Sequence, residues 1–126
     1  MRRATPGDLQ VRRTGEHAVA VFPAEVDGTN APGIRIALLR LLGSGVPAVI
    51  VDLSACRFCD ANGVEALLRA HIRATTLTIP LHVVLPEGGQ VRAVCRSTGV
   101  TRTVALAADV AEAEAAIART RAEDDR

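Results

Sequence analysis

Alternating and continuous runs of apolar residues predict four strands in the first two thirds of the chain. Residues 9–13 alternate in character, as a half-buried strand does, and a turn at residues 15–17 leads into an apolar run over residues 18–22. We therefore expect these two strands to form a β-hairpin. Continuous apolar runs at residues 48–53 and 81–85 are typical of strands that are buried on both faces of a sheet.

Apolar residues at helical spacing separate these strands. The further predicted segments are a helix over residues 34–42, a helix that begins at Asp60, a helix that begins at Gln90, a short strand over residues 103–106 and a helix from Asp109 to about Thr120. Residues 24–33 and 54–60 are expected to be connecting segments. This order of elements indicates an α/β fold with a mixed four- to five-stranded sheet, flanked by about four helices.

The helix that begins at Asp60 has the clearest pattern in the sequence. Its apolar positions recur at i, i+3, i+4, i+7 and i+8: Val64, Leu67, Leu68, His71 and Ile72. Glu65 and Arg69 lie on the other side, four residues apart, where opposite charges attract. We expect the apolar stripe to face the core.

Length and composition favour one globular domain. A chain of 126 residues with 48% hydrophobic and 23% charged residues is too short for two sizeable cores and too apolar for disorder. We expect a flexible N-terminus over residues 1–8, a domain over residues 9–120 and a charged, frayed tail over residues 121–126. A net charge of +1 and a total of two aromatic residues, Phe22 and Phe58, argue against nucleic-acid binding.

The sequence has no segment with the features of an export signal or a membrane span. The basic start of the chain is followed by no apolar core, and the most apolar stretches, residues 36–42 and 48–51, are far below membrane-spanning length. Three cysteines, an odd number, fit reduced thiols. We therefore expect a cytoplasmic protein that does not insert into a membrane.

The residues that could carry chemistry do not gather into a catalytic or metal-binding motif. Cys56 and Cys59 form a C-x-x-C pair, but a second pair of zinc ligands is missing, and the pair precedes the expected helix start instead of opening a helix. No nucleophile elbow and no nucleotide-binding glycine pattern is present. We therefore expect no catalytic residue, no metal and no cofactor. A thiol-based redox sensor that uses Cys56, Cys59 or Cys95 is an alternative.

The start of the second predicted helix carries more information. Asp60 is a strong N-cap residue, which places Ala61, Asn62 and Gly63 in the first helical turn. A glycine there lowers helix propensity, so we expect a close approach by another backbone. The first turn also presents free N–H groups and the positive end of the helix dipole. These features fit simple capping as well as a binding surface.

Several stretches of the sequence resemble the STAS domain family, the family of bacterial anti-sigma factor antagonists. The central signature lies in residues 49–54 (VIVDLS), 58–64 (FCDANGV) and 66–68 (ALL). Residues 21–27 (VFPAEVD) resemble the family's second strand and the acidic loop after it, and residues 97–100 (STGV) resemble the turn after its third helix. The resemblance covers nearly the whole chain and implies a single STAS-like domain that binds a regulatory protein.

The resemblance also implies a binding surface and a departure from the family's switch. The family's antagonists typically carry Asp-Ser-Ser-Gly at the helix start, and a partner kinase phosphorylates the Ser right after the Asp. Here that position is Ala61, which has no hydroxyl, so we expect no phosphorylation there. The partner-binding residues implied by the resemblance are Asp27, Gly28, Thr29, Asp60, Ala61, Asn62, Gly63 and Val64.

The resemblance leaves two kinds of regulatory role open. The leading one is docking on an anti-sigma factor or a related kinase-like regulator, and the alternative is an accessory or scaffold subunit of a transporter or a stressosome-like assembly. A second copy of the chain is a further candidate partner. Ile36 and Leu39 lie off the main stripe of the first predicted helix. Two interpretations fit this position: an apolar patch for a partner or a dimer contact, and a helix that the chain's own loops cover on two sides.

Overall fold

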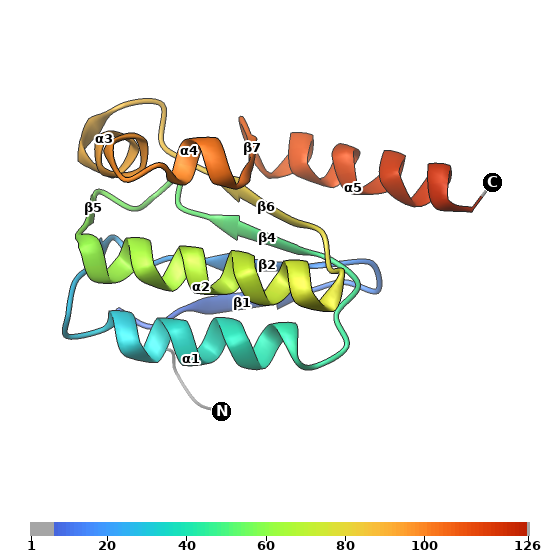
Figure 1. Cartoon of the computed structure of the whole chain (residues 1–126), viewed down its shortest axis with the longest axis horizontal. Coiled ribbons are helices and arrows are strands. Elements are labelled where there is room, and N and C mark those ends of the chain that lie inside the picture. The colour runs from blue at the N-terminus through green and yellow to red at the C-terminus, as the bar shows by residue number, and fades with distance from the viewer. Residues whose placement is uncertain (1–6, 126) are drawn as a thin grey trace.

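The computed structural model describes residues 7–125 of the chain (Figure 1). The elements in chain order are β1 (Gln10–Arg13), β2 (Ala18–Val21), β3 (Glu25–Val26), α1 (Ala31–Leu42), β4 (Val49–Asp52), β5 (Phe58–Cys59), α2 (Ala61–Leu77), β6 (Leu81–Val84), α3 (Gly89–Ser97), α4 (Val100–Thr103), β7 (Ala105–Ala107) and α5 (Val110–Asp124). Residues 1–6, which make up most of the N-terminus expected to be flexible, lie outside the described residues, as does residue 126.

Five of the strands form one mixed sheet in the order β1-β2-β4-β6-β7. β1 and β2 are antiparallel neighbours, which confirms the predicted hairpin, and the other neighbouring strands are parallel. Val49, Ile50 and Val51 of the central strand are fully buried, as a continuous apolar run predicts. The α/β class and the mixed five-stranded sheet expected from the sequence are therefore confirmed.

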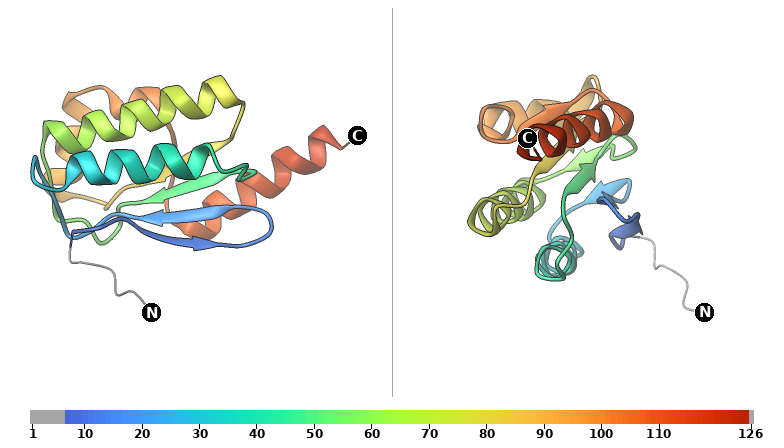
Figure 2. Two further views of the ribbon diagram at one scale, coloured as in Figure 1. Left: turned by 90° about the horizontal axis from the view of Figure 1, so that it is seen from below. Right: turned by 90° about the vertical axis from the view of Figure 1, so that its right-hand side faces the viewer.

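Helices cover the sheet on both faces, so the molecule has three layers. α1 and α2 lie side by side on one face with α3 and α4 beyond them, and α5 covers the other face (Figures 1 and 2). Successive strand residues point into opposite cores. The smaller core, between the sheet and α5, contains Val19, Ala48, Ile50, Val84, Ala107, Ala113 and Ile117. The larger core lies under the other helices and reaches the loops around β3 and β5.

The apolar stripe expected on α2 is only partly right. Val64 and Leu67 are buried, whereas Leu68 and His71 are half-buried and Ile72 is 64% exposed. The buried face otherwise consists of small residues: Gly63, Ala66, Ala70 and Ala74. Small side chains let a helix lie close to its neighbours, and a pattern read from the large apolar residues does not detect them.

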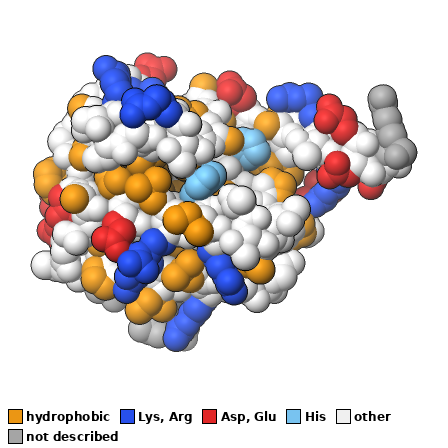
Figure 3. Space-filling view, in the orientation of Figure 1, with side chains coloured by type: hydrophobic (Ala, Val, Ile, Leu, Met, Phe, Trp, Pro, Cys, Tyr) orange, Lys and Arg blue, Asp and Glu red, His pale blue; other side chains and the backbone are white. Residues whose placement is uncertain are grey.

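The patch expected on α1 stays a prediction. Ile36 is 47% exposed and Leu39 is half-buried. On the face that α1 and α2 present, apolar side chains are interspersed with basic ones (Figure 3). The exposed apolar area is therefore divided into small pieces, which is ordinary for a monomer surface and equally compatible with a weak contact.

The C-terminal part of the chain differs from the prediction in two places. Residues 100–103 form the short helix α4, so β7 begins at Ala105 and not at residue 103. The last helix continues to Asp124, past the end expected at about residue 120. Residues 121–124 are therefore helical, and the expectation of a frayed tail from residue 121 is wrong for them.

Polar contacts join α5 to the β1–β2 hairpin. The guanidinium of Arg121 donates a hydrogen bond to the backbone oxygen of Glu16 (3.3 Å) and lies 3.5 Å from the Glu16 carboxylate. Two helical turns earlier in α5, the carboxylate of Glu114 lies 2.9 Å from His17 Nε2. These polar contacts join two segments about 100 residues apart, and a local sequence pattern cannot predict them.

Candidate functional site

A short parallel ladder joins the two connecting segments that the sequence analysis marked as loops. β3 and β5 pair in the register Glu25↔Phe58 and Val26↔Cys59. The Asp60 N–H donates to the Val26 oxygen (3.1 Å), which continues the ladder to the start of α2. The pairing places the chain around Asp27 beside the first turn of α2. The two segments implied by the family resemblance therefore meet in space.

Asp60 is the N-cap residue of α2, as predicted. Its Oδ1 atom accepts hydrogen bonds from the backbone N–H groups of Asn62 (2.9 Å) and Gly63 (3.4 Å). The Asn62 side-chain amide donates to the other carboxylate oxygen (3.3 Å). Ala61 is exposed at the tip of the helix. The helix end thus presents a fixed carboxylate and a neutral methyl group to solvent.

The Asp27 loop is held by its own hydrogen bonds. Asp27 Oδ1 accepts from the Thr29 hydroxyl (2.5 Å) and from the Thr29 backbone N–H (2.8 Å). These bonds, that of the hydroxyl first, hold the pKa of the Asp27 carboxyl below its ordinary value. Asp27 therefore carries its negative charge throughout the neutral pH range, in a fixed orientation.

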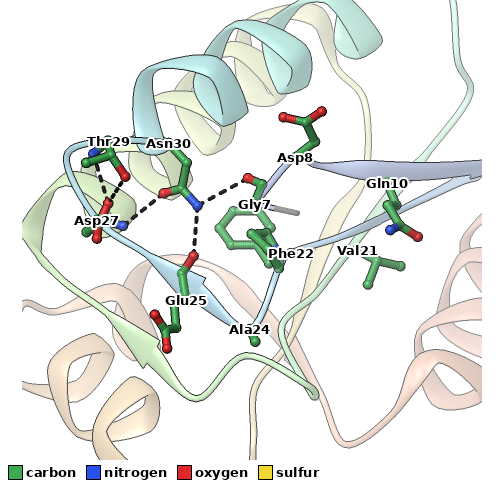
Figure 4. Close-up of a pocket in the computed structure, with 11 residues that line it drawn as sticks. Gly7, Asp8, Gln10, Val21, Phe22, Ala24, Glu25, Asp27, Thr29 and Asn30 are labelled. Atoms are coloured by element: carbon green, nitrogen blue, oxygen red, sulfur yellow. Dashed lines mark hydrogen bonds between the residues drawn. The ribbon is translucent and has the colours of Figure 1, made fainter. Parts of the chain in front are cut away.

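Asn30 fixes this loop and was not identified from the sequence. Its Oδ1 atom accepts from the Asp27 N–H (2.9 Å), and its Nδ2 group donates to the backbone oxygens of Glu25 (2.8 Å) and Gly7 (3.1 Å) (Figure 4). An Asn three residues after an Asp in a turn-rich segment is a local signal for such a bond. The contact with Gly7 spans 23 residues and has no local signal.

The two segments are in van der Waals reach of each other. A Cβ atom added to Gly28 would lie 3.4 Å from the Asn62 amide nitrogen. Six of the eight residues implied as partner-binding are exposed or half-exposed: Asp27, Gly28, Thr29, Asp60, Ala61 and Asn62. The other two, Gly63 and Val64, are buried. Gly63 and Val64 therefore support this surface from beneath, and they are not available for direct contact with a partner.

A cavity of about 610 Å³ lies beside the Asp27 loop, toward β1 and β2. Three carboxylate residues, Asp8, Glu25 and Asp27, contribute to its lining (Figure 4). The side chain of Glu25 points away from Asn30, as Figure 4 shows. The cavity thus extends the acidic character of the Asp27 loop along the edge of the molecule.

Gly63 is required by side-chain packing. A Cβ atom added there would clash with Cys59 Sγ and would lie 2.8 Å from Val26 Cγ1. Both neighbours are fully buried. The close approach expected at this glycine is therefore confirmed. The neighbouring atoms, however, belong to side chains of the β3–β5 ladder and not, as we had expected, to another backbone.

We expect Gly63→Ala to lower the free energy of unfolding by about 1–3 kcal/mol, because overpacking a rigid core outweighs the gain in helix propensity of about 1 kcal/mol. Gly33→Ala in α1 is the matched control, since nothing lies within 4 Å of an added Cβ atom there. That variant should be more stable by about 0.5–1 kcal/mol. Denaturant unfolding of both variants measures the difference. Equal stability changes in the same direction would contradict the packing role of Gly63.

Gln90 closes the free edge of β5 and was also missed as a site residue. Its Oε1 atom accepts from the Cys59 N–H (2.8 Å), and its Nε2 group donates to the Cys59 oxygen (2.7 Å). The side-chain amide thus takes the place of a neighbouring strand. Since Gln90 lies in the first turn of α3, this contact couples the position of α3 to the ladder.

The three cysteines are free and buried. Burial raises the pKa of Cys59 to about 12 and that of Cys95 to about 11, and it also raises the pKa of Cys56. Cys59 lies in β5 and Cys56 precedes that strand, so neither thiol lies in the first turn of a helix that could activate it. The thiols have the properties of core side chains.

We expect a thiol reagent such as dithionitrobenzoate to react very slowly with the folded protein at pH 8. Because burial raises the pKa of all three thiols, only a very small fraction of each is a thiolate at that pH. In guanidinium chloride the same sample should release three equivalents at once, since the chain has three cysteines. A rapid native-state reaction of Cys56 or Cys59 would instead favour the redox alternative.

Two observations concern metal and membrane binding. Among residues 7–125, no group of three or more His, Cys, Asp and Glu side chains is arranged to hold a metal ion. In the same part of the chain, each helix is too short or too polar to cross a membrane. The exposed and half-exposed side chains of the site are the Asp27 and Asp60 carboxylates, the Thr29 hydroxyl, the Asn62 amide and the Ala61 methyl group.

Comparison with known proteins identifies the family and the fold. The model of the STAS domain matches residues 8–113. The crystal structure of an anti-sigma factor antagonist from Mycobacterium paratuberculosis superposes with a TM-score of 0.79 at 24% identity, covering 91% of this chain and 98% of that one. No curated protein sequence matches the chain significantly.

Two structures of the anti-sigma factor antagonist SpoIIAA are also similar. The unphosphorylated form has a TM-score of 0.71 at 22% identity, with 90% of this chain and 96% of that chain covered. The phosphorylated form, described as a Bacillus cell fate determinant, has a TM-score of 0.62 at 22% identity, with 89% and 98% covered. Identities this low establish the shared fold. Because the family model spans most of the sequence, the chain belongs to the STAS domain family.

Proposed function

We propose that this STAS domain is a non-catalytic regulatory module that docks on an anti-sigma factor or a related kinase-like regulator in the cytoplasm. The docking surface consists of the exposed residues of the Asp27 loop and of the first turn of α2. The protein acts by binding alone, and turnover, a metal or a cofactor plays no part in this role.

The observation that carries this proposal is the β3–β5 ladder. It brings Asp27 and Asp60, which are 33 residues apart in the sequence, to neighbouring positions on one surface. Both carboxylates are held by hydrogen bonds within their own turns, so the surface is pre-organised and loses little conformational entropy when a partner binds. The similar structures named anti-sigma factor antagonists support the choice of partner.

Ala61 distinguishes this chain from a phosphorylation-switched antagonist. SpoIIAA is known in a phosphorylated and an unphosphorylated form. The family resemblance places the acceptor hydroxyl at the position of Ala61, where this chain has a methyl group. Binding should therefore stay constant when the regulator and ATP are present together.

The two alternative roles are less well supported. A redox sensor needs an accessible thiol with a lowered pKa, and burial raises the pKa of each of the three cysteines. A scaffold subunit of a transporter or stressosome-like assembly would use a STAS surface of the same kind. The identity of the partner separates that role from the proposed one.

The test is calorimetric titration of the protein with purified kinase-like anti-sigma factors from the organism that carries the gene. We expect one of them to bind with the same affinity with and without ATP. Ala61→Ser restores the missing hydroxyl and is the control for phosphorylation. Phosphate transfer to this variant and not to the wild type would place the regulator at the tip of α2.

Two results would contradict the proposal. Failure of the folded protein to bind each of these regulators would remove the anti-sigma role. Residues 60–64 of the wild type have no side-chain hydroxyl, so a kinase has no hydroxyl to modify there. Phosphate incorporation elsewhere in the wild type, together with a loss of affinity, would contradict constant binding.

A further inference from the structure

Phe58 is exposed beside the proposed docking surface. It is one of two aromatic residues in the chain, and the other, Phe22, is buried in the core with 2% of its surface exposed. Phe58 is 42% exposed, whereas its neighbour in β5, Cys59, is fully buried. The alternation of side chains along the strand thus points Cys59 inward and Phe58 outward.

Glu25 is the direct cross-strand neighbour of Phe58. The two residues are partners in the β3–β5 register, and both are exposed, whereas the next pair, Val26 and Cys59, is buried. Register partners of a parallel ladder lie on the same side of the strands. The aromatic ring and the carboxylate are therefore presented to solvent together.

The backbone under this pair is held on both sides. Asn30 Nδ2 donates to the Glu25 oxygen (2.8 Å) next to β3, and the Gln90 amide makes two bonds to Cys59 next to β5. A short ladder of two residues per strand gains its rigidity from these side-chain contacts. The backbone that carries the ring and the carboxylate is thus fixed before a partner arrives.

The charge of the surface selects a basic partner. Residues 24–30 and 57–63 contain three acidic side chains, Glu25, Asp27 and Asp60, and one basic side chain, Arg57. These segments carry a net charge of about −2, whereas the whole chain carries +1. A partner patch with positive charge would be attracted to this part of the molecule.

We propose that Phe58 and Glu25 together bind an arginine side chain of the partner protein. This inference rests on the proposed function and adds a recognition element to it. A guanidinium group is planar, stacks on an aromatic face and donates parallel hydrogen bonds to a carboxylate. A lysine ammonium lacks the planar face and is more strongly hydrated, so the pair favours arginine. Phe58 then serves as an apolar anchor at the edge of the docking surface.

The test uses the regulator that binds the wild type and four variants of this chain. Phe58→Ala and Phe58→Leu remove the ring, Glu25→Gln removes the charge, and Ile72→Ala is the matched control, because it truncates a 64% exposed apolar residue on α2 outside the surface. We expect both Phe58 variants to bind about 10- to 100-fold more weakly, Glu25→Gln about 3- to 10-fold more weakly, and Ile72→Ala normally. Melting curves confirm that each variant is folded, and Phe58→Leu keeps the apolar volume if Phe58→Ala is unstable.

The exposed arginines of the regulator are replaced one at a time by lysine. One such change should weaken binding to the wild type clearly more than binding to Phe58→Leu, because the stacked contact is already lost in that variant and only the contact with Glu25 remains. If the Phe58 variants bind like the wild type while Ala61→Glu does not bind, the inference is overturned and the proposed function stands. A loss at Phe58 that couples to none of the arginines overturns the assignment of arginine. If the wild type binds no regulator, the inference and the proposed function are both overturned.

Discussion

Leu67→Ala should lower the free energy of unfolding by about 2–5 kcal/mol, because truncating a fully buried leucine removes apolar contacts and leaves a cavity. Leu67 is 1% exposed and belongs to the larger core. Leu68, its neighbour in the sequence, is half-buried at the margin of the same core. Leu68→Ala should therefore cost about 1–2 kcal/mol.

Arg69→Ala is the control for the exposed side of the same helix. Its guanidinium pairs with Glu65 at 2.9 Å, as the spacing predicts, but both side chains are more than half exposed. Such a surface pair contributes less than about 1 kcal/mol. Urea or guanidinium unfolding should rank the losses as Leu67, then Leu68, then Arg69. A larger loss for Leu68 than for Leu67 would mean that α2 turns Leu68, and not Leu67, toward the core.

The sequence pattern correctly predicted the elements that are determined by local interactions or by burial. The strands around Val49–Asp52 and Leu81–Val84 consist of apolar residues at nearly each position, and Asp60 caps α2 through bonds to residues two and three positions away. In each case the deciding interactions are local, or burial alone determines them. The periodicity of apolar residues in a single sequence is sufficient to predict such segments.

The features that were missed depend on contacts between distant segments. β3 and β5 have two residues each, too few for a recognisable alternation, and they exist because they pair with each other. Gln90 is recognisable as a site residue only when α3 is placed against β5, 31 residues away in the sequence. The extra turn of α5 likewise carries Arg121, which contacts the distant hairpin. Tertiary contacts override local preference at these points.

The candidate site was predicted in part, for the same reason. The family resemblance implied the Asp27 loop and the α2 start together, and the ladder explains physically why they belong together. It implied Gly63 and Val64 as contacts, although both are buried. The position of a residue in a motif does not show whether it contacts a partner directly or supports the neighbouring residues from the core.

Ala61→Glu should abolish most of the binding to the regulator and leave the fold intact. Ala61 is exposed in the first turn of α2, where the helix dipole favours a negative charge by about 0.3–1 kcal/mol. The proposed partner arginine is held by Phe58 and Glu25, so a carboxylate added at Ala61 would be buried in the contact next to Asp27 and Asp60 with no positive group of its own. An unpaired buried charge costs several kcal/mol, so we expect the affinity to fall by about 100-fold or more.

Ala111→Glu is the matched control for this change. Ala111 is exposed in the first turn of α5, after the N-cap residue Asp109, and it lies on the opposite side of the sheet. Both variants add one negative charge to the chain at the same kind of helix position, so they should melt at similar temperatures. A titration in which Ala111→Glu binds normally and Ala61→Glu does not would assign the loss to the α2 tip. Equal affinities for wild type and Ala61→Glu would remove this surface from the mechanism, because a contact that buries Ala61 cannot accept the charge without a loss.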